Sequence, residues 1–241
     1  MNYSYRDIAG MIDHSLLNPA LTTAELEAGC RLALEYEVAS VCIQPYYLAE
    51  CAHRLGNSGV QPSTTIGFPH GGHTTSTKLA EVEQALKDGG TELDMVINIG
   101  KARSGDWEYV KQEIEALTSA THAGGAKIKV IFENAYLDDA EKIRLCEICG
   151  EIGVDWVKTS TGYAPTGATL ADVKLMRQHS PAQVAVKAAG GVRTLDALLE
   201  MRAIGATRVG ASATAQILDE CRMRLGMPAK AATPEVAISG Y

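Results

Sequence analysis

The sequence predicts a single-domain α/β protein built as a (β/α)8 barrel. Short apolar, β-favouring runs alternate with amphipathic helical stretches, and we count eight such pairs along the chain. The connections are short, and no linker-like stretch interrupts them. This alternation implies a parallel sheet. Eight units within 241 residues favour a closed barrel over an open sheet.

The eight strands are predicted at residues 11–14, 39–43, 63–68, 92–97, 127–132, 154–158, 184–187 and 207–210. Helices are predicted over residues 24–36, 47–55, 74–86, 106–120, 138–149, 170–178, 195–204 and 212–225. Thr22 and Thr194 are candidate N-caps, and Ser212 opens the last helix. The barrel is therefore assigned to residues 1–225, followed by an Ala- and Pro-rich tail over residues 226–241.

Composition excludes several kinds of protein. Hydrophobic residues make up 46% of the chain, which is enough for a substantial core, and no run approaches the length of a membrane span. The net charge of −7 and the absence of a long basic run argue against a nucleic-acid partner. The first residues contain no apolar signal core, so we expect a cytoplasmic protein with small-molecule partners. A homo-oligomer is expected, with a dimer as the preferred state.

The chain has six cysteines, which we expect to be free thiols in a reducing compartment. Cys146 and Cys149 have C-x-x-C spacing, but they fall within a helical pattern and have no second pair. Buried helix cysteines are therefore favoured over a zinc or redox site.

Two lysines occur at the ends of apolar strands. Lys158 follows Val154-Asp-Trp-Val157 and Lys187 follows Val184-Ala-Val186, and a glycine comes shortly after each lysine. A lysine is rarely buried unless it is paired or functional. If both point into the barrel, burial and mutual repulsion would lower the pKa of one amine, and a neutral amine can form a Schiff base with a carbonyl. For a single lysine, the simpler interpretation would be a side chain that reaches solvent.

Acidic residues on other strands could complete such a site. Asp94 lies within the apolar run Leu93–Ile97, where it could pair with a lysine and shuttle protons, or form a purely structural ion pair. Lys129 and Glu133 are four residues apart on the fifth strand. They could extend the same charged network or satisfy one another.

Glycines near the ends of the last two strands resemble a phosphate cradle. Gly190-Gly191 follows the seventh strand, and Gly210-Ala-Ser212 precedes the last helix. Backbone N–H groups at a helix N-terminus attract anions, and barrels often hold phosphate at these two loops.

Three further features have simpler explanations. His70 and His73 offer only two metal ligands, so a glycine-rich loop with exposed imidazoles is favoured over a metal site. Asp13-His14 could contact substrate or cap the following turn. Cys42 is expected to be a small core residue, with pocket lining as the alternative.

In these strand-end residues the chain resembles the deoxyribose-phosphate aldolases, a family of class I, Schiff-base aldolases. The most specific segments are Val157-Lys-Thr-Ser-Thr-Gly162, Val186-Lys-Ala-Ala-Gly-Gly191 and Glu92-Leu-Asp-Met-Val-Ile-Asn98. Gly67-Phe-Pro69 and Arg208-Val-Gly-Ala-Ser212 also match. Tyr163, His70 and Phe132-Glu-Asn134 depart from common family patterns.

The resemblance implies a barrel that needs neither metal nor organic cofactor. It also implies reversible cleavage of 2-deoxyribose 5-phosphate to acetaldehyde and glyceraldehyde 3-phosphate. Lys158 matches the Schiff-base lysine, Lys187 the lysine that perturbs it, and Asp94 the proton-relay residue. Asp13 matches a residue near the substrate hydroxyls. The phosphate-binding segment of the family matches Gly162, Gly190, Gly191, Gly210 and Ser212.

Some members of the family use a C-terminal tyrosine to assist proton exchange, and Tyr241 ends this chain. A disordered tail is the alternative for this segment. Two other functions remain open at this stage. One is a Schiff-base aldolase or lyase for another sugar phosphate, and the other is a non-catalytic barrel that binds phosphorylated ligands.

Overall fold

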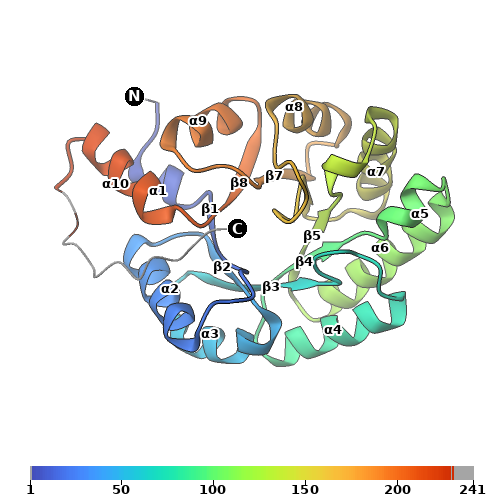
Figure 1. The fold of residues 1–241 in the computed structure, drawn as a ribbon, viewed down its shortest axis with the longest axis horizontal. Coiled ribbons are helices and arrows are strands. Elements are labelled where there is room, and N and C mark those ends of the chain that lie inside the picture. The colour runs from blue at the N-terminus through green and yellow to red at the C-terminus, as the bar shows by residue number, and fades with distance from the viewer. Residues whose placement is uncertain (1, 229, 231–241) are drawn as a thin grey trace.

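The computed structural model describes residues 2–228 and 230, and its eight strands form one closed parallel barrel (Figure 1). Each strand pairs with the next along the chain, and β8 pairs with β1 to close the ring. The prediction of a (β/α)8 barrel is therefore confirmed. The strands are β1 (Ile12–Leu16), β2 (Ser40–Ile43), β3 (Gln61–Ile66), β4 (Glu92–Val96), β5 (Lys127–Ile131), β6 (Trp156–Lys158), β7 (Ala185–Ala189) and β8 (Ala206–Ala211).

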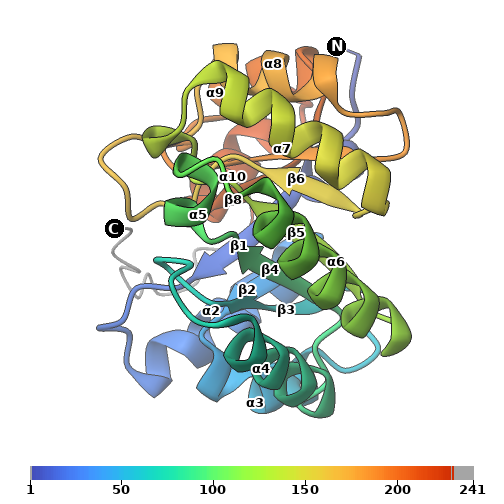
Figure 2. The ribbon, with the colours of Figure 1, turned by 90° about the vertical axis from the view of Figure 1, so that its right-hand side faces the viewer.

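Helices surround the strands on the outside of the barrel (Figures 1 and 2). They are α1 (Tyr5–Ala9), α2 (Thr23–Tyr36), α3 (Leu48–Leu55), α4 (Thr75–Lys87), α5 (Ile99–Arg103), α6 (Trp107–Ala123), α7 (Asp139–Ile152), α8 (Leu170–His179), α9 (Leu195–Ala203) and α10 (Thr214–Arg224). Two 3-10 turns, η1 (Pro45–Tyr47) and η2 (Asn134–Tyr136), complete the connections. Every predicted helix is present to within a few residues at its ends.

The predicted caps are partly confirmed. The hydroxyl of Thr22 accepts a hydrogen bond from the backbone N–H of Glu25, and Thr194 does the same for Ala197. Ser212 does not open α10, which begins two residues later at Thr214. Ser212 therefore lies in the loop between β8 and α10.

The sequence analysis missed α1 and α5. Each has only five residues, which is less than two helical turns, so neither leaves a readable apolar period. A polar side chain caps each of them. Ser4 accepts from the backbone of Asp7, and Asn98 accepts from Lys101.

Alternation along the strands separates an apolar layer from a charged interior. On β4, Leu93 and Met95 are fully buried in the hydrophobic cluster between strands and helices. Glu92 and Asp94 have the opposite orientation and make ion pairs with residues from other strands. The interior of the barrel is thus a buried polar site rather than a purely apolar core.

The described cysteines are all buried and free, including Cys146 and Cys149 within α7. None of the helices in the described part of the chain is long and apolar enough to cross a membrane. The last helix ends at Arg224, and most of the predicted tail, including Tyr241, lies outside the described residues.

Candidate active site

Two lysines meet at one carboxylate inside the barrel. Lys158 and Lys187 are direct register partners on β6 and β7. The Nζ of each lies 2.7 Å from the same atom, Oδ2 of Asp94 on β4. All three side chains are almost completely buried. The structure therefore brings together the three residues that the sequence analysis singled out for amine chemistry.

Asp13 on β1 joins this group from the other side. Its Oδ2 lies 2.5 Å from the Nζ of Lys187, and its Oδ1 accepts a hydrogen bond from Arg208 on β8. Asp13 therefore does not cap a turn. The neighbouring His14 has the opposite orientation, and its Nδ1 contacts the hydroxyl of Thr214 in α10 at 2.8 Å.

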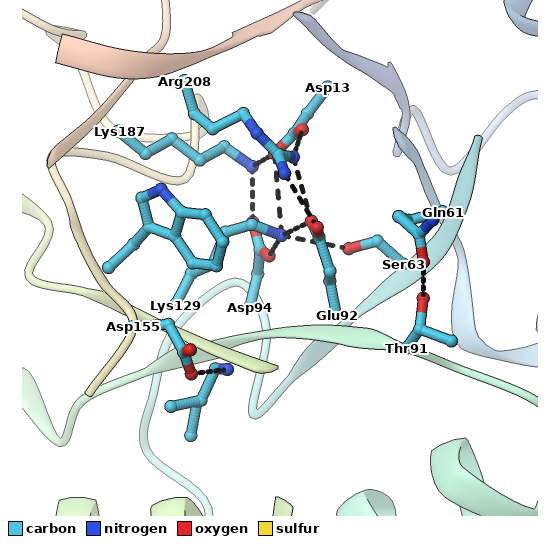
Figure 3. Close-up of polar contacts among 12 residues, drawn as sticks. Asp13, Gln61, Ser63, Thr91, Glu92, Asp94, Lys129, Asp155, Lys187 and Arg208 are labelled. Atoms are coloured by element: carbon cyan, nitrogen blue, oxygen red, sulfur yellow. Dashed lines mark hydrogen bonds and ion pairs between the residues drawn. The ribbon is translucent and has the colours of Figure 1, made fainter. Parts of the chain in front are cut away.

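Lys129 and Glu92 belong to the same cluster (Figure 3), but they do not line the pocket as Lys158 and Lys187 do. The Nζ of Lys129 contacts Oδ1 of Asp94 at 2.8 Å and Oε2 of Glu92 at 2.7 Å. Glu92 in turn accepts two hydrogen bonds from the guanidinium of Arg208, at 2.8 and 3.0 Å. Six strands thus contribute charged side chains to one connected network.

The network shifts the pKa values of Lys158 and Lys187 in opposite directions. Burial lowers the pKa of Lys158, and the charge of Lys187 lowers it further, which together outweigh the opposing effect of Asp94. Burial alone would also lower the pKa of Lys187. However, Asp13 and Asp94 together raise that pKa above its ordinary value. Lys158 is therefore the amine more able to exist in its neutral form.

A pocket opens above the network at the carboxyl ends of the strands. Lys158 and Lys187 lie among its lining residues, and Cys42 from β2 also lines it, which was the alternative interpretation of that thiol. The predicted substrate-binding residues that line this pocket are Asp13, Gly162, Gly190, Gly191, Gly210 and Ser212. The structure thus gathers every described residue of the predicted site at one place.

Two of these glycines allow close approach of other groups. A Cβ on Gly190 would lie 2.9 Å from the Cα of Gly167, and its φ of 85° is unfavourable for other residues. A Cβ on Gly210 would lie 3.5 Å from Cε of Lys187 and 3.2 Å from Cβ of Ala189. The contact with Ala189 would be tight, whereas the one with Lys187 is an ordinary van der Waals distance.

Part of the pocket lining is suited to an anion. Ser212 and Arg193 line it beside the two adjacent glycines, and α10 begins shortly after Ser212. The first backbone N–H groups of a helix lack acceptors within the helix and attract negative charge. Arg193 is a pocket residue that the sequence analysis did not select.

Glu133 has a different partner from the one considered in the sequence. It does not pair with Lys129, but accepts hydrogen bonds from the backbone N–H and the hydroxyl of Thr161. Glu133 itself has a φ of 59°, an uncommon conformation for a residue with a side chain. Thr161 lines the pocket, so Glu133 holds the loop that follows Lys158.

Among the described residues, no group of three or more histidine, cysteine or acidic side chains is arranged to hold a metal ion. His70 and His73 are both exposed. The exposed imidazoles expected for this glycine-rich loop are thus observed.

The sequence analysis assigned no role to Glu92 or Arg208. Both lie at ordinary strand positions, Glu92 as the first residue of β4 and Arg208 in the middle of β8. A charged residue at either position is also compatible with an exposed strand end. Their signals were an arginine inside a β-favouring run and the place of both residues in segments that match the family.

A closed parallel barrel with a buried lysine beside a carboxylate, at the carboxyl ends of its strands, has the features expected of a barrel enzyme of the aldolase class. Comparison with known proteins gives the family. Residues 8–217 match the model of the DeoC/LacD family of aldolases. The chain therefore belongs to the DeoC/LacD family aldolases.

Individual relatives agree with this assignment. The chain is 62% identical over 240 residues to a protein of Rhodopirellula baltica named deoxyribose-phosphate aldolase, covering 100% of this chain and 99% of that one. It superimposes with a TM-score of 0.87 on a putative deoxyribose-phosphate aldolase from Coccidioides immitis, at 35% identity over 91% of this chain and 87% of that chain. A deoxyribose phosphate aldolase from Aeropyrum pernix, described as tetrameric, gives a TM-score of 0.84 at 30% identity, over 91% of this chain and 92% of that one.

Proposed function

We propose that this chain is a class I aldolase that reversibly cleaves 2-deoxy-D-ribose 5-phosphate to acetaldehyde and D-glyceraldehyde 3-phosphate. The names of its relatives support this substrate. The observation that carries the proposed mechanism is that Lys158 and Lys187 share one oxygen of Asp94 beside the pocket. This arrangement offers a nucleophilic amine, a nearby ammonium group and a carboxylate at one point.

Lys158 is the proposed nucleophile. Its lowered pKa favours the neutral amine, which attacks the aldehyde carbon of the open-chain sugar and loses water to give an imine. The protonated imine accepts electrons when the bond between C2 and C3 breaks. Glyceraldehyde 3-phosphate then leaves, and an enamine remains on Lys158.

Asp94 and Lys187 are the proposed proton carriers. Cleavage requires removal of the proton from the C3 hydroxyl, and the enamine then takes a proton at C2. Water hydrolyses the resulting imine, which releases acetaldehyde and restores the amine of Lys158. A carboxylate that contacts both amines at 2.7 Å can pass protons between them and the substrate. Lys187 keeps its proton because of Asp13 and Asp94, and so also supplies positive charge beside Lys158.

The phosphate is proposed to bind at the loops after β7 and β8. Gly162, Gly190, Gly191, Gly210 and Ser212 line this end of the pocket, with Arg193 as a cation and α10 beginning nearby. Asp13 also lines the pocket, beside Lys187, where its carboxylate could accept from a sugar hydroxyl.

Reduction with borohydride in the presence of acetaldehyde tests the mechanism. Peptide mass spectrometry should find an ethyl group on Lys158 in the wild-type protein, and no label there in Lys158→Met. Labelling of Lys187 instead would reverse the proposed roles. The absence of any label would favour a barrel that only binds phosphorylated ligands. Turnover of another sugar phosphate in preference to deoxyribose 5-phosphate would identify a different aldolase.

Three further proposals concern the whole protein. Tyr241 is proposed to assist proton exchange, so Tyr241→Phe should slow deuterium incorporation into the acetaldehyde methyl group while Lys158 is still trapped. A homo-oligomer is proposed, with a dimer preferred. The tetrameric relative supports oligomerisation in general, and light scattering would measure the oligomeric state.

Cytoplasmic localisation is supported by the free, buried cysteines among the described residues.

A further inference from the structure

The lower part of the barrel interior contains charged residues that the proposed reaction does not use. Arg208 donates to both oxygens of Glu92, and Glu92 also contacts Lys129 at 2.7 Å. Asp13 and Asp94 connect this lower group to the two lysines at the pocket. Figure 3 shows the side chains of this network other than Lys158, which converge on one region from different strands.

Formal charges in this network do not balance if every base is protonated. The network holds four bases and three carboxylates, so full protonation leaves one net positive charge within the barrel. An uncompensated charge in a buried site is energetically costly. The base with the fewest carboxylate contacts is therefore the first to lose its proton. One neutral base makes the network electrically neutral. The four bases are Lys129, Lys158, Lys187 and Arg208, and the three carboxylates are Asp13, Glu92 and Asp94.

Contacts decide which base is neutral. Arg208 contacts two carboxylates and cannot lose its proton in a protein. Lys129 lies within 2.8 Å of two carboxylates and 3.6 Å from a third. Lys187 contacts both Asp13 and Asp94. Lys158 contacts only Asp94, through the Oδ2 atom that Lys187 also contacts. Its protonated form is therefore the least stabilised of the four.

We propose that Arg208 and Glu92 are positioning residues that set the net charge of this buried network and thereby keep Lys158 as its single uncharged amine. The inference rests on the proposed imine chemistry of Lys158 and adds two residues to it. Neither residue needs to touch the substrate. Arg208 supplies a fixed positive charge, and Glu92 supplies the carboxylate that holds Arg208 and Lys129 together.

Burial allows these charges to act at a distance. The side chains of Lys129 and Glu92 are 0% and 4% exposed, so little water screens them. The indole of Trp156 covers this group, with the guanidinium carbon of Arg208 5.0 Å from the ring centroid. Lys129 lies 5.7 Å from the same ring.

Two titratable side chains outside the network interact with Lys158, namely Cys42 and Glu133. Cys42 on β2 lines the pocket, and burial raises its pKa, which favours the neutral thiol. Glu133, after β5, is bound to Thr161, and burial raises its pKa too. The hydroxyl of Ser63 on β3 contacts Lys129 at 3.5 Å and carries no charge. Glu133 is thus a further carboxyl that interacts with the charge of Lys158, and it is unchanged in every variant of the network.

Two substitutions of opposite charge test the proposal. Glu92→Gln removes a negative charge and keeps an oxygen acceptor, so Lys158 should release its proton more readily. Arg208→Gln removes a positive charge, so Lys158 should hold its proton more firmly. The pH midpoint for ethylation of Lys158 by acetaldehyde and cyanoborohydride should move down in the first variant and up in the second, each on the order of one pH unit. Arg208→Gln combined with Glu92→Gln should return the midpoint close to that of the wild type.

Matched controls separate charge from structure. Lys127→Gln removes an exposed charge from the same strand as Lys129 and should leave the midpoint in place. Arg208→Lys keeps the charge, and should stay near the wild-type midpoint even if it lowers stability. Circular dichroism and thermal melting show whether each variant is folded. Where Arg208→Gln does not fold, Glu92→Gln and Arg208→Lys carry the test.

The results distinguish this inference from the proposed function. Opposite shifts that cancel in the double variant support the role of Arg208 and Glu92. If Lys158 is ethylated in the wild type but the midpoints of the folded variants do not move, or move in the same direction, the inference is overturned and the aldolase mechanism stands. If wild-type Lys158 is not ethylated at all, the proposed mechanism fails, and the inference fails with it.

Discussion

Replacement of Lys187 by methionine tests the electrostatic basis of the site. Both Nζ atoms lie 2.7 Å from Oδ2 of Asp94, so the two amines are at most about 5.4 Å apart. Two unit charges at that distance repel by about 3 kcal/mol at an effective dielectric constant of ~20. Because 1.36 kcal/mol corresponds to a factor of ten, loss of this repulsion favours the protonated form of Lys158 on the order of 100-fold.

The expected result is a shift of the activity profile to higher pH. The Lys187 charge holds the pKa of Lys158 down in the wild type, so Lys187→Met should raise it and leave less neutral amine at a given pH. The assay is kcat/KM for cleavage of deoxyribose 5-phosphate across the pH range, together with borohydride trapping of Lys158 at each pH. Lys111→Met, which removes an exposed lysine from α6, is the control. An unchanged or acid-shifted profile in Lys187→Met would refute the assigned electrostatic role.

Three other substitutions probe separate parts of the molecule. Asp94→Asn should lower turnover by about 10²–10⁴-fold, because it removes the proposed proton carrier, and wild-type turnover would make Asp94 purely structural. Ser212→Asp should raise KM for deoxyribose 5-phosphate far more than for free deoxyribose, since it adds a negative charge where phosphate is proposed to bind. Equal effects on the two substrates would place the phosphate elsewhere. Lys78→Met should cost about 3–5 kcal/mol of unfolding free energy in chemical denaturation, because it leaves the fully buried Glu113 without its cation at 2.9 Å. A loss below 1 kcal/mol would show that Glu113 is neutral or reaches water.

Much of the fold was predictable because it follows from local patterns. Alternating apolar strands and amphipathic helices predicted the eight-fold barrel, and its length and short loops favoured closure. Hydroxyl caps such as Thr22 were readable because a cap lies only three residues from the backbone group it binds. The start of α10 was placed two residues early, since Ser212 has the residue type of a cap but Ala213 occupies that position.

The candidate site was predictable where a residue type was unusual for its strand. Lysines at the ends of two apolar runs, and an aspartate inside a third, pointed to amine chemistry before any distance was known. Tyr241 was selected because some members of the family use a C-terminal tyrosine, and its position lies outside the described residues.

The sequence by itself determined the alternation of elements and the presence of amines, carboxylates and glycines at strand ends. Only the tertiary structure decided which of them touch. Asp94 is 93 residues from Lys187 and 64 from Lys158, and closure of the barrel with its particular register brings all three to one oxygen. The same closure recruited Arg208 and Glu92, and paired Glu133 with Thr161 rather than with Lys129. Local sequence cannot specify these contacts, because they depend on how all eight strands are staggered around the ring.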